Sequence, residues 1–321
     1  MVRRLAAAVV AVLAMSLIGA VSAQAEPVAT IEHTERVSGT QTKLSVFSPA
    51  MNRVVTVQVL HPARSGSRPT LYLLDGVSAG EESDFRESTW TQRTDIEEFF
   101  ADKNVNVVLP VGGTASYYTD WNAPDPVLGV NKWETFLTRE LPPVIDANFG
   151  GNGTDAVAGL SMGATAAMAL ITRHPDLYEG VAALSGCFDT SQDRSRESVR
   201  GTVAYKGGNP DNMWGPPGDP RWAEHDSYLL AERLRGKKIF LSTGNGVLGP
   251  YDLDAGQDVL TVGAPLEIGT LACTLTYDRR LRELGIPAQV VYRPWGTHSW
   301  GYWQDDIKTA WPTLAEALGL R

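Results

Sequence analysis

The chain has 321 residues, of which 43% are hydrophobic, 20% charged and 8% aromatic, and this composition excludes a collagen-like, low-complexity or disordered protein. Its formal net charge of -9 leaves no positive field to neutralise a phosphate backbone, so we expect no nucleic-acid partner. The length suits one large α/β domain, and the sequence contains no internal repeat and no linker that divides it.

The first residues are typical of an export signal. Two arginines precede an apolar run over residues 5–21, and Ala-Gln-Ala at 23–25 matches an A-x-A cleavage site. An uncleaved membrane anchor is the alternative, but a serine and a glycine interrupt the run. We therefore predict a signal peptide over residues 1–25, a secreted or envelope-bound protein, and a single mature domain over 26–321 without a membrane span.

The predicted export determines which oxidation state we expect for the two cysteines, Cys187 and Cys273. An oxidising compartment favours a disulfide between them, and a pair of buried reduced thiols is the alternative. Neither cysteine has metal-ligand spacing to another cysteine or histidine. We expect neither a metal nor a cofactor.

The order of apolar runs predicts an α/β fold. Apolar and polar residues alternate from about Lys43 to Leu60 across a turn, which predicts an antiparallel hairpin. Later, short apolar runs alternate with helix-like stretches, the pattern of a mostly parallel sheet covered by helices on both faces. The predicted strands are 70–74, 105–110, 155–159, 180–185, 238–242 and 288–292, and the predicted helices are 132–147, 162–174, 268–284 and 304–318. A segment rich in Trp, Gly and Pro, from about Ser191 to Asp226, is expected to be an ordered excursion over the sheet.

Two segments match the G-x-S-x-G motif, one around Ser78 and one around Ser161. The motif supports chemistry only where a strand ends in a tight turn that runs directly into a helix. An apolar strand precedes Ser161, and a helix with small residues in its first turn follows it, whereas Ser78 runs into charged sequence. Ser161 is therefore the predicted nucleophile, and the motif indicates an α/β-hydrolase fold.

The Ser78 segment has a different predicted use. In this fold one oxyanion-hole N–H comes from the residue after the nucleophile, and another comes from the loop after an earlier strand. These positions are Met162 and Val77, which we predict as backbone donors. An ordinary tight turn is the alternative for residues 76–80.

The base follows by elimination among five histidines. Triad residues in α/β-hydrolases follow the order serine, acid, histidine, with the histidine near the C-terminus. His33, His61 and His174 come too early or end the nucleophile helix. His225 precedes the strand that should come before the acid. His298, in a loop directly after the last predicted strand, is the predicted base.

The acid should lie between the 238–242 strand and His298. The candidate carboxylates there are Asp252, Asp254, Asp258, Glu267 and Asp278. From the pattern alone Asp252, Asp254 and Glu267 are nearly equal, and spacing does not separate them.

Eight segments, in this order, resemble the antigen 85-type mycolyltransferases of mycolic-acid bacteria. They are LYLLDG (71–76), LPVGG (109–113), YTDW (118–121), KWETFLTRELP (132–142), GLSMG (159–163), DNMWGPPGDPRW (211–222), STGNG (242–246) and GTHSWGYW (296–303). The resemblance covers about Thr40 to Leu320, and KWETFLTRELP and THSWGYW are far more specific than G-x-S-x-G. It implies an α/β-hydrolase fold and the transfer of mycolyl groups from trehalose monomycolate to sugar hydroxyls of trehalose monomycolate or arabinogalactan.

The resemblance also implies roles for single residues. The family's acid, a glutamate that opens the helix before the last strand, matches Glu267. Its oxyanion donors fall on Val77 and Met162, in agreement with the motif. Its trehalose-contacting aspartate falls on Asp75, and the tryptophan beside its histidine falls on Trp300.

The chain departs from the mycobacterial members at two places. Ser78 stands where those members carry an arginine that helps to bind the sugar, and the loop after Trp121, where they hold a disulfide, contains no cysteine. The chain therefore resembles the corynebacterial or rhodococcal branch more closely, and its acceptor contacts are expected to differ.

The expected partners are trehalose mycolates, cell-wall glycan and a lipid acyl chain. Aromatic rings near the site could contact a sugar or lipid, or could anchor the core and loops. These rings are Trp214, Trp222, Trp295, Trp300 and Trp303. Because the same triad serves transfer and hydrolysis, a secreted carboxylesterase or lipase is the alternative, and a catalytically inactive sugar- or protein-binding scaffold is a further one.

Overall fold

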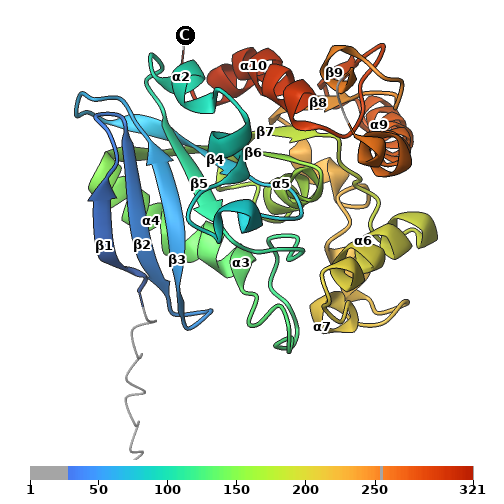
Figure 1. The fold of residues 1–321 in the computed structure, drawn as a ribbon, viewed down its shortest axis with the longest axis horizontal. Helices are drawn as coiled ribbons and strands as arrows, with labels where there is room; N and C mark the ends of the chain where they lie inside the picture. The colour runs from blue at the N-terminus through green and yellow to red at the C-terminus, as the bar shows by residue number, and fades with distance from the viewer. Residues whose placement is uncertain (1–27, 254–255, 321) are drawn as a thin grey trace, which may run out of the picture.

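The computed structural model describes residues 28–253 and 256–320, so the predicted signal peptide over residues 1–25 lies outside it. The described strands form one sheet in the order β1-β2-β3-β5-β4-β6-β7-β8-β9 (Figure 1). β1, β2, β3 and β5 pair antiparallel in that order, and every pair from β5–β4 to β8–β9 is parallel. The predicted α/β class with a mostly parallel sheet is confirmed.

The strands agree with the predicted runs and include one strand that the pattern did not predict. They are β1 (Thr30–Arg36), β2 (Gln41–Ser48), β3 (Arg53–Leu60), β4 (Arg68–Leu74), β5 (Asn106–Val111), β6 (Gly151–Leu160), β7 (Tyr178–Leu184), β8 (Lys238–Thr243) and β9 (Gln289–Tyr292). β1 is the addition. Its side chains are almost all exposed, so it lacks the apolar alternation that identifies a half-buried strand.

The helices include all four predicted stretches, two of which begin one turn earlier than predicted, and several helices that the pattern did not predict. In chain order the helices are η1 (Glu81–Ser83), α1 (Thr89–Arg93), α2 (Ile96–Phe100), α3 (Trp133–Thr135), η2 (Phe136–Glu140), α4 (Leu141–Phe149), α5 (Met162–Arg173), α6 (Asp193–Tyr205), α7 (Asp211–Trp214), α8 (Arg221–Glu224), η3 (Ala231–Leu234), η4 (Pro250–Asp252), η5 (Val259–Gly263), α9 (Ala264–Glu283) and α10 (Trp300–Ala317). η5 runs directly into α9, because Gly263 between them has helical φ and ψ, and Pro265 lies at this junction.

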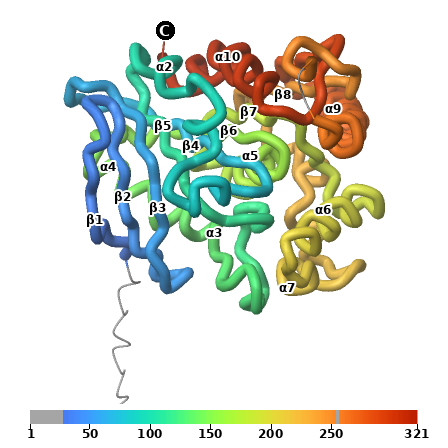
Figure 2. The backbone as a smooth tube through the Cα atoms, in the orientation of Figure 1, coloured from blue at the N-terminus to red at the C-terminus, as the bar shows by residue number. Residues whose placement is uncertain are grey.

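Helices cover both faces of the sheet, as Figures 1 and 2 show. Successive residues of β4 point to opposite faces, so Tyr72 and Leu74 pack into the core beneath α4 and α5. Leu71 and Leu73 pack into a second core, which α10 closes with side chains such as Ile307. The parallel strands are therefore buried on both sides, and their carboxyl ends are left to carry a site.

The predicted excursion is ordered and contains α6 and α7, which Figure 1 labels, and α8. Trp214 and Trp222 are each 2% exposed and pack edge to face, with ring centroids 5.0 Å apart. Their indole N–H groups donate to Thr119 Oγ1 and to the Gly215 carbonyl. These two rings therefore anchor the excursion and do not offer faces to a substrate.

A buried carboxyl group lies at the opposite end of the sheet from the carboxyl ends of the parallel strands. Asp155 of β6 is 3% exposed and is in register with Thr70 of β4. Burial and the nearby Asp146 carboxylate raise the pKa of Asp155 to about 7. Because this folded-state value exceeds the ordinary one, stability falls as pH rises toward 7, where the folded protein must bury the ionised form.

Asp155→Asn should therefore stabilise the protein above pH 7. We expect the free energy of unfolding at pH 8 to rise by a few kcal/mol (order of magnitude only). The gain at pH 5 should be clearly smaller, because that pH lies only about one unit above the ordinary aspartate pKa at which the unfolded chain begins to ionise. Denaturant unfolding at the two pH values measures this. Asp176→Asn, at an exposed carboxylate, is the matched control. A gain of equal size at both pH values would contradict the assignment.

Candidate active site

Ser161 occupies the turn between β6 and α5 in a strained conformation. Its φ is 53° and its ψ is -120°, a combination that residues other than glycine rarely adopt. The two motif glycines allow this turn: a Cβ on Gly159 would lie 2.5 Å from the Gly163 carbonyl oxygen, and one on Gly163 would collide with the Asp75 carbonyl. The sequence motif is thus the steric condition for a serine that projects from the turn.

Three side chains that are far apart in sequence form one chain of hydrogen bonds. His298 Nε2 lies 2.8 Å from Ser161 Oγ, and His298 Nδ1 lies 2.8 Å from Glu267 Oε2. In the tautomer that satisfies both contacts, Nδ1–H donates to the carboxylate and Nε2 accepts from the serine hydroxyl. Ser161 comes from the β6–α5 turn, Glu267 from the first turn of α9, and His298 from the loop before α10.

Glu267 is fully buried and still ionised. Burial alone would raise its pKa, but the hydrogen bond and charge of His298, the charge of Arg293 and the Gly244 N–H together hold the pKa below its ordinary value. Its Oε1 accepts from Arg293 Nη2 at 2.9 Å, from Gly244 N at 2.5 Å and from Ser185 Oγ at 2.8 Å. A carboxylate held in this way can orient the imidazole and stabilise an imidazolium.

The structure separates the acid candidates that the pattern left equal. Asp252 accepts from Thr297 Oγ1 and from the Tyr302 hydroxyl, each at 2.6 Å. These bonds hold the loop that carries His298, and neither of them involves the imidazole. Asp254 lies outside the described residues. Of the two described candidates, Glu267 alone contacts His298.

Three further side chains surround the Ser161–His298–Glu267 hydrogen bonds. Trp303 was expected near the site as an aromatic ring, whereas Ser185 and Arg293 were not identified from the sequence. Trp303 donates its indole N–H to Ser185 Oγ at 3.0 Å and packs edge-on against the His298 ring, with centroids 4.7 Å apart. Arg293 pairs with Glu267 and with the buried Asp306. Ser185 and Arg293 each directly follow a parallel strand, and the rule that sites form at carboxyl ends of strands could have identified them.

The predicted oxyanion donors belong to two segments that lie next to Ser161. Met162 is the first residue of α5, where a backbone N–H has no partner within the helix. The loop with Val77 passes close to the serine, because a Cβ added to Gly76 would lie 3.7 Å from Ser161 Cβ. The Val77 carbonyl, in the peptide after the one that carries the Val77 N–H, accepts from the Ala115 N–H at 3.0 Å and so ties this loop to the segment after β5. Their function as donors stays a prediction.

The two residues predicted to bind sugar, Asp75 and Trp300, are linked through Trp90. Asp75 is fully buried and accepts from the Thr89 and Trp90 N–H groups at 3.0 and 3.3 Å. Burial raises the pKa of Asp75 to about 7. Trp300 packs edge-on against Trp90 and Trp303. Contacts from either residue to a sugar stay a prediction.

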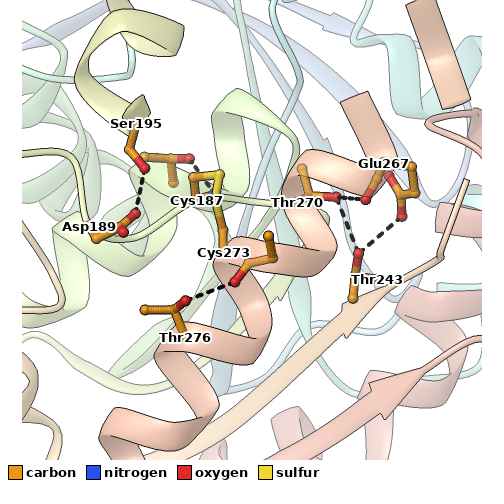
Figure 3. The surroundings of a disulfide bond; sticks show 10 residues. Cys187, Asp189, Ser195, Thr243, Glu267, Thr270, Cys273 and Thr276 are labelled. Carbon is orange, nitrogen blue, oxygen red and sulfur yellow. Dashed lines mark hydrogen bonds between the residues drawn. A yellow bond between two sulfur atoms is a disulfide. The ribbon is translucent and has the colours of Figure 1, made fainter. Parts of the chain in front are cut away.

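The predicted disulfide between Cys187 and Cys273 is confirmed (Figure 3). It joins the loop after β7 to α9, and the two Cα atoms are 4.9 Å apart across a sequence separation of 86. Figure 3 shows Thr270 on α9 between Cys273 and Glu267, with Thr243 of β8 beside Thr270. Within the described ranges, no group of three or more His, Cys, Asp or Glu side chains is placed to hold a metal ion.

The helical stretch Val259–Glu283 is apolar enough to cross a membrane by length and composition alone. Its mean hydropathy is 1.4, and 22% of the apolar window is buried. A single stretch of this kind is weak evidence for a span, and here it carries Glu267 in contact with His298. The absence of a membrane span beyond the signal peptide stays a prediction.

Comparisons with known proteins agree with this geometry. Residues 48–314 match the esterase family described as "Putative esterase". The diacylglycerol acyltransferase/mycolyltransferase Ag85A of Mycobacterium tuberculosis is 35% identical over 286 residues, which cover 86% of this chain and 81% of the relative. The corresponding Ag85B of Mycobacterium leprae is 34% identical over 283 residues, 86% of this chain and 83% of the relative. The chain belongs to the antigen 85 family of esterases.

Solved structures support the fold of this antigen 85 family member. The crystal structure of Mycobacterium tuberculosis MPT51 (FbpC1) superposes with a TM-score of 0.73 at 26% identity, covering 86% of this chain and 97% of that one. An S-formylglutathione hydrolase from Agrobacterium tumefaciens gives a TM-score of 0.65 at 16% identity, covering 90% of this chain and 99% of that one. The second likeness shows the α/β-hydrolase fold alone.

Glu267→Gln tests whether the carboxylate charge matters. The amide keeps the size but removes the charge that stabilises an imidazolium, so turnover of a chromogenic ester should fall by about 10²- to 10⁴-fold. The acidic limb of the pH–rate profile should also move to lower pH, because protonated His298 loses its neighbouring anion. Glu283→Gln, at an exposed position on the same helix, is the control. Equal rates for the two variants would remove Glu267 from the site.

Proposed function

We propose that this protein is a serine-dependent acyltransferase that moves mycolyl groups from trehalose monomycolate to sugar hydroxyls. The observation that carries the proposal is the Ser161–His298–Glu267 hydrogen-bond chain in a member of the antigen 85 family. The relatives' names supply the acyl group and the transfer reaction, and the geometry supports Ser161 as nucleophile, His298 as base and Glu267 as acid.

The first half of the proposed reaction acylates the enzyme. His298 takes the Ser161 proton as the hydroxyl oxygen attacks the carbonyl carbon of the donor ester, and Glu267 stabilises the resulting imidazolium. The N–H groups of Val77 and Met162 donate to the oxyanion, a contribution of roughly 3 to 4 kcal/mol for each donor. The tetrahedral intermediate then collapses, His298 protonates the departing sugar oxygen, and trehalose leaves.

The second half transfers the acyl group from the enzyme. A sugar hydroxyl, from a second trehalose monomycolate or from arabinogalactan, loses its proton to His298 and attacks the mycolyl-Ser161 ester. Ser161 regains a proton from His298, and a mycolylated sugar is released. The kinetics are therefore ping-pong. Asp75 and Trp300 are the proposed contacts for the sugar, and because Asp75 is fully buried, the segment that covers it would have to move before a sugar could reach its carboxyl group.

The proposed location is outside the cytoplasm. The lipid and glycan substrates of such an enzyme belong to the cell envelope, and the N-terminal sequence has the arginine pair, apolar run and A-x-A site of a signal peptide. Cleavage after residue 25 would leave a chain that starts at Glu26. N-terminal sequencing of the envelope and medium fractions tests this.

Product analysis with trehalose monomycolate tests transfer against hydrolysis. The proposal predicts that trehalose dimycolate accumulates and that free trehalose is released in equal amount. Release of free mycolate without dimycolate would instead identify a carboxylesterase or lipase, the reading that membership of the wider esterase family favours. Absence of any product, together with no labelling by a fluorophosphonate, would identify an inactive scaffold.

Ser161→Ala should lower both the transfer and the ester-cleavage rates by several orders of magnitude, because the acyl-enzyme cannot form. Thermal unfolding should change little, since alanine fits a turn whose neighbours are small. Ser78→Ala, in the other G-x-S-x-G match, is the control and should retain activity. Normal transfer by the Ser161 variant would refute the nucleophile assignment.

A further inference from the structure

The helix that carries Glu267 is weakly anchored in the half where Glu267 lies. Over residues 264–274 the buried side chains of α9 are Glu267, Thr270 and Thr274, all of them polar. The large apolar side chains in this half, such as Leu266 and Ile268, are 45% and 53% exposed. Buried apolar side chains anchor a helix more strongly than isolated polar contacts, and on α9 they begin only at Tyr277.

We propose that the Cys187–Cys273 disulfide is the positioning element for the Glu267 carboxylate, in place of the apolar anchoring that this half of α9 lacks. The inference rests on the proposed triad. It assigns the disulfide a role in turnover, beyond its contribution to folding stability.

The disulfide completes a short closed path of covalent and hydrogen bonds that begins and ends at the Glu267 carboxylate. Cys273 lies six residues, less than two helical turns, after Glu267, and Cys187 lies two residues after Ser185. Ser185 Oγ in turn donates to Glu267 Oε1 at 2.8 Å. The path from the carboxylate along α9, through the disulfide and back along the loop after β7 therefore returns to the same carboxylate.

The other end of the disulfide is fixed to the helix that follows the nucleophile. Cys187 N donates to Thr165 Oγ1 at 3.3 Å. Gly186 is packed so tightly that an added Cβ would lie 2.8 Å from Ala164 Cβ and 3.1 Å from Thr165 N. Both of these residues belong to the first turn of α5, which begins directly after Ser161. The disulfide therefore fixes α9 to the same helix that holds the serine in place.

A polar contact next to the disulfide also holds this half of α9 against the sheet. Thr270 Oγ1 lies 3.2 Å from Thr243 Oγ1, at the carboxyl end of β8. Thr270 Oγ1 also donates to the Glu267 carbonyl at 3.0 Å. Without the disulfide, such single hydrogen bonds and the buried ionic contacts of Glu267 would have to hold the first turns of α9. An ionised carboxylate regains hydration if its helix moves outward. The proposal is therefore that the disulfide keeps Glu267 in its fully buried position.

The double variant Cys187→Ala/Cys273→Ala tests the proposal with a chromogenic ester. We expect kcat to fall by roughly tenfold to a hundredfold, because displacement of the acid by about 1 Å misdirects the imidazole, while KM changes little. We also expect the acidic limb of the pH–rate profile to move to lower pH, as for Glu267→Gln. A folded variant with unchanged kcat would overturn the proposal.

A double-mutant cycle separates positioning from stability. If the disulfide acts through Glu267, its removal from the Glu267→Gln enzyme should cost little additional kcat, so the two effects should be strongly non-additive. Leu281→Ala, which removes an apolar anchor from the other half of α9, should lower the melting temperature without moving the acidic limb. Additive losses, or a Leu281→Ala profile identical to that of the double cysteine variant, would overturn the proposal.

Reduction of the native protein covers the case in which the double variant does not fold. A dithiol reductant passes two electrons and two protons to the sulfur–sulfur bond, giving two cysteine thiols while the reductant becomes a cyclic disulfide. At constant far-UV circular dichroism, loss of kcat should parallel the appearance of two thiols, and reoxidation should restore kcat. Full activity with both thiols free would overturn the proposal. Failure of the untreated enzyme to react with a fluorophosphonate would instead overturn the triad on which it rests.

Discussion

The hydrogen bond between His298 and a fully buried, ionised Glu267 is the interaction on which the rest of the site depends. Burial of a carboxylate is costly unless charges and donors compensate it. Here Arg293, the Gly244 N–H and Ser185 fill the lone pairs that the imidazole does not use. The result is a fixed negative charge directed at one edge of the imidazole, whose opposite edge faces Ser161.

The sheet explains why these groups meet. Gly244 and Ser185 directly follow β8 and β7, and Arg293 directly follows β9, so three neighbouring parallel strands deliver them to one edge. Ser161 follows β6, the next strand in the same order. Much of the site is therefore a property of strand order, whereas α9 with Glu267 and α10 with Trp303 are brought to that edge from outside the sheet.

Most of the fold was predictable because its signals are local. Short apolar runs separated by helical stretches gave the parallel strands, and the small residues around Ser161 gave the tight turn. β1 was not predicted because an exposed edge strand has no buried face and therefore no alternation of apolar and polar residues. It is held in the sheet by backbone pairing to β2. The acid could not be chosen from spacing, since the decision between Asp252 and Glu267 depends on which side chain α9 and η4 turn toward the imidazole.

The proposed acyl-enzyme is the central claim of this account, and mass spectrometry of the intact protein tests it most directly. After brief mixing with trehalose monomycolate, the account predicts a mass increase of one mycolyl group, mapped to the peptide that contains Ser161 and removed by added trehalose. Turnover without a covalent adduct, or an adduct on another residue, would contradict it.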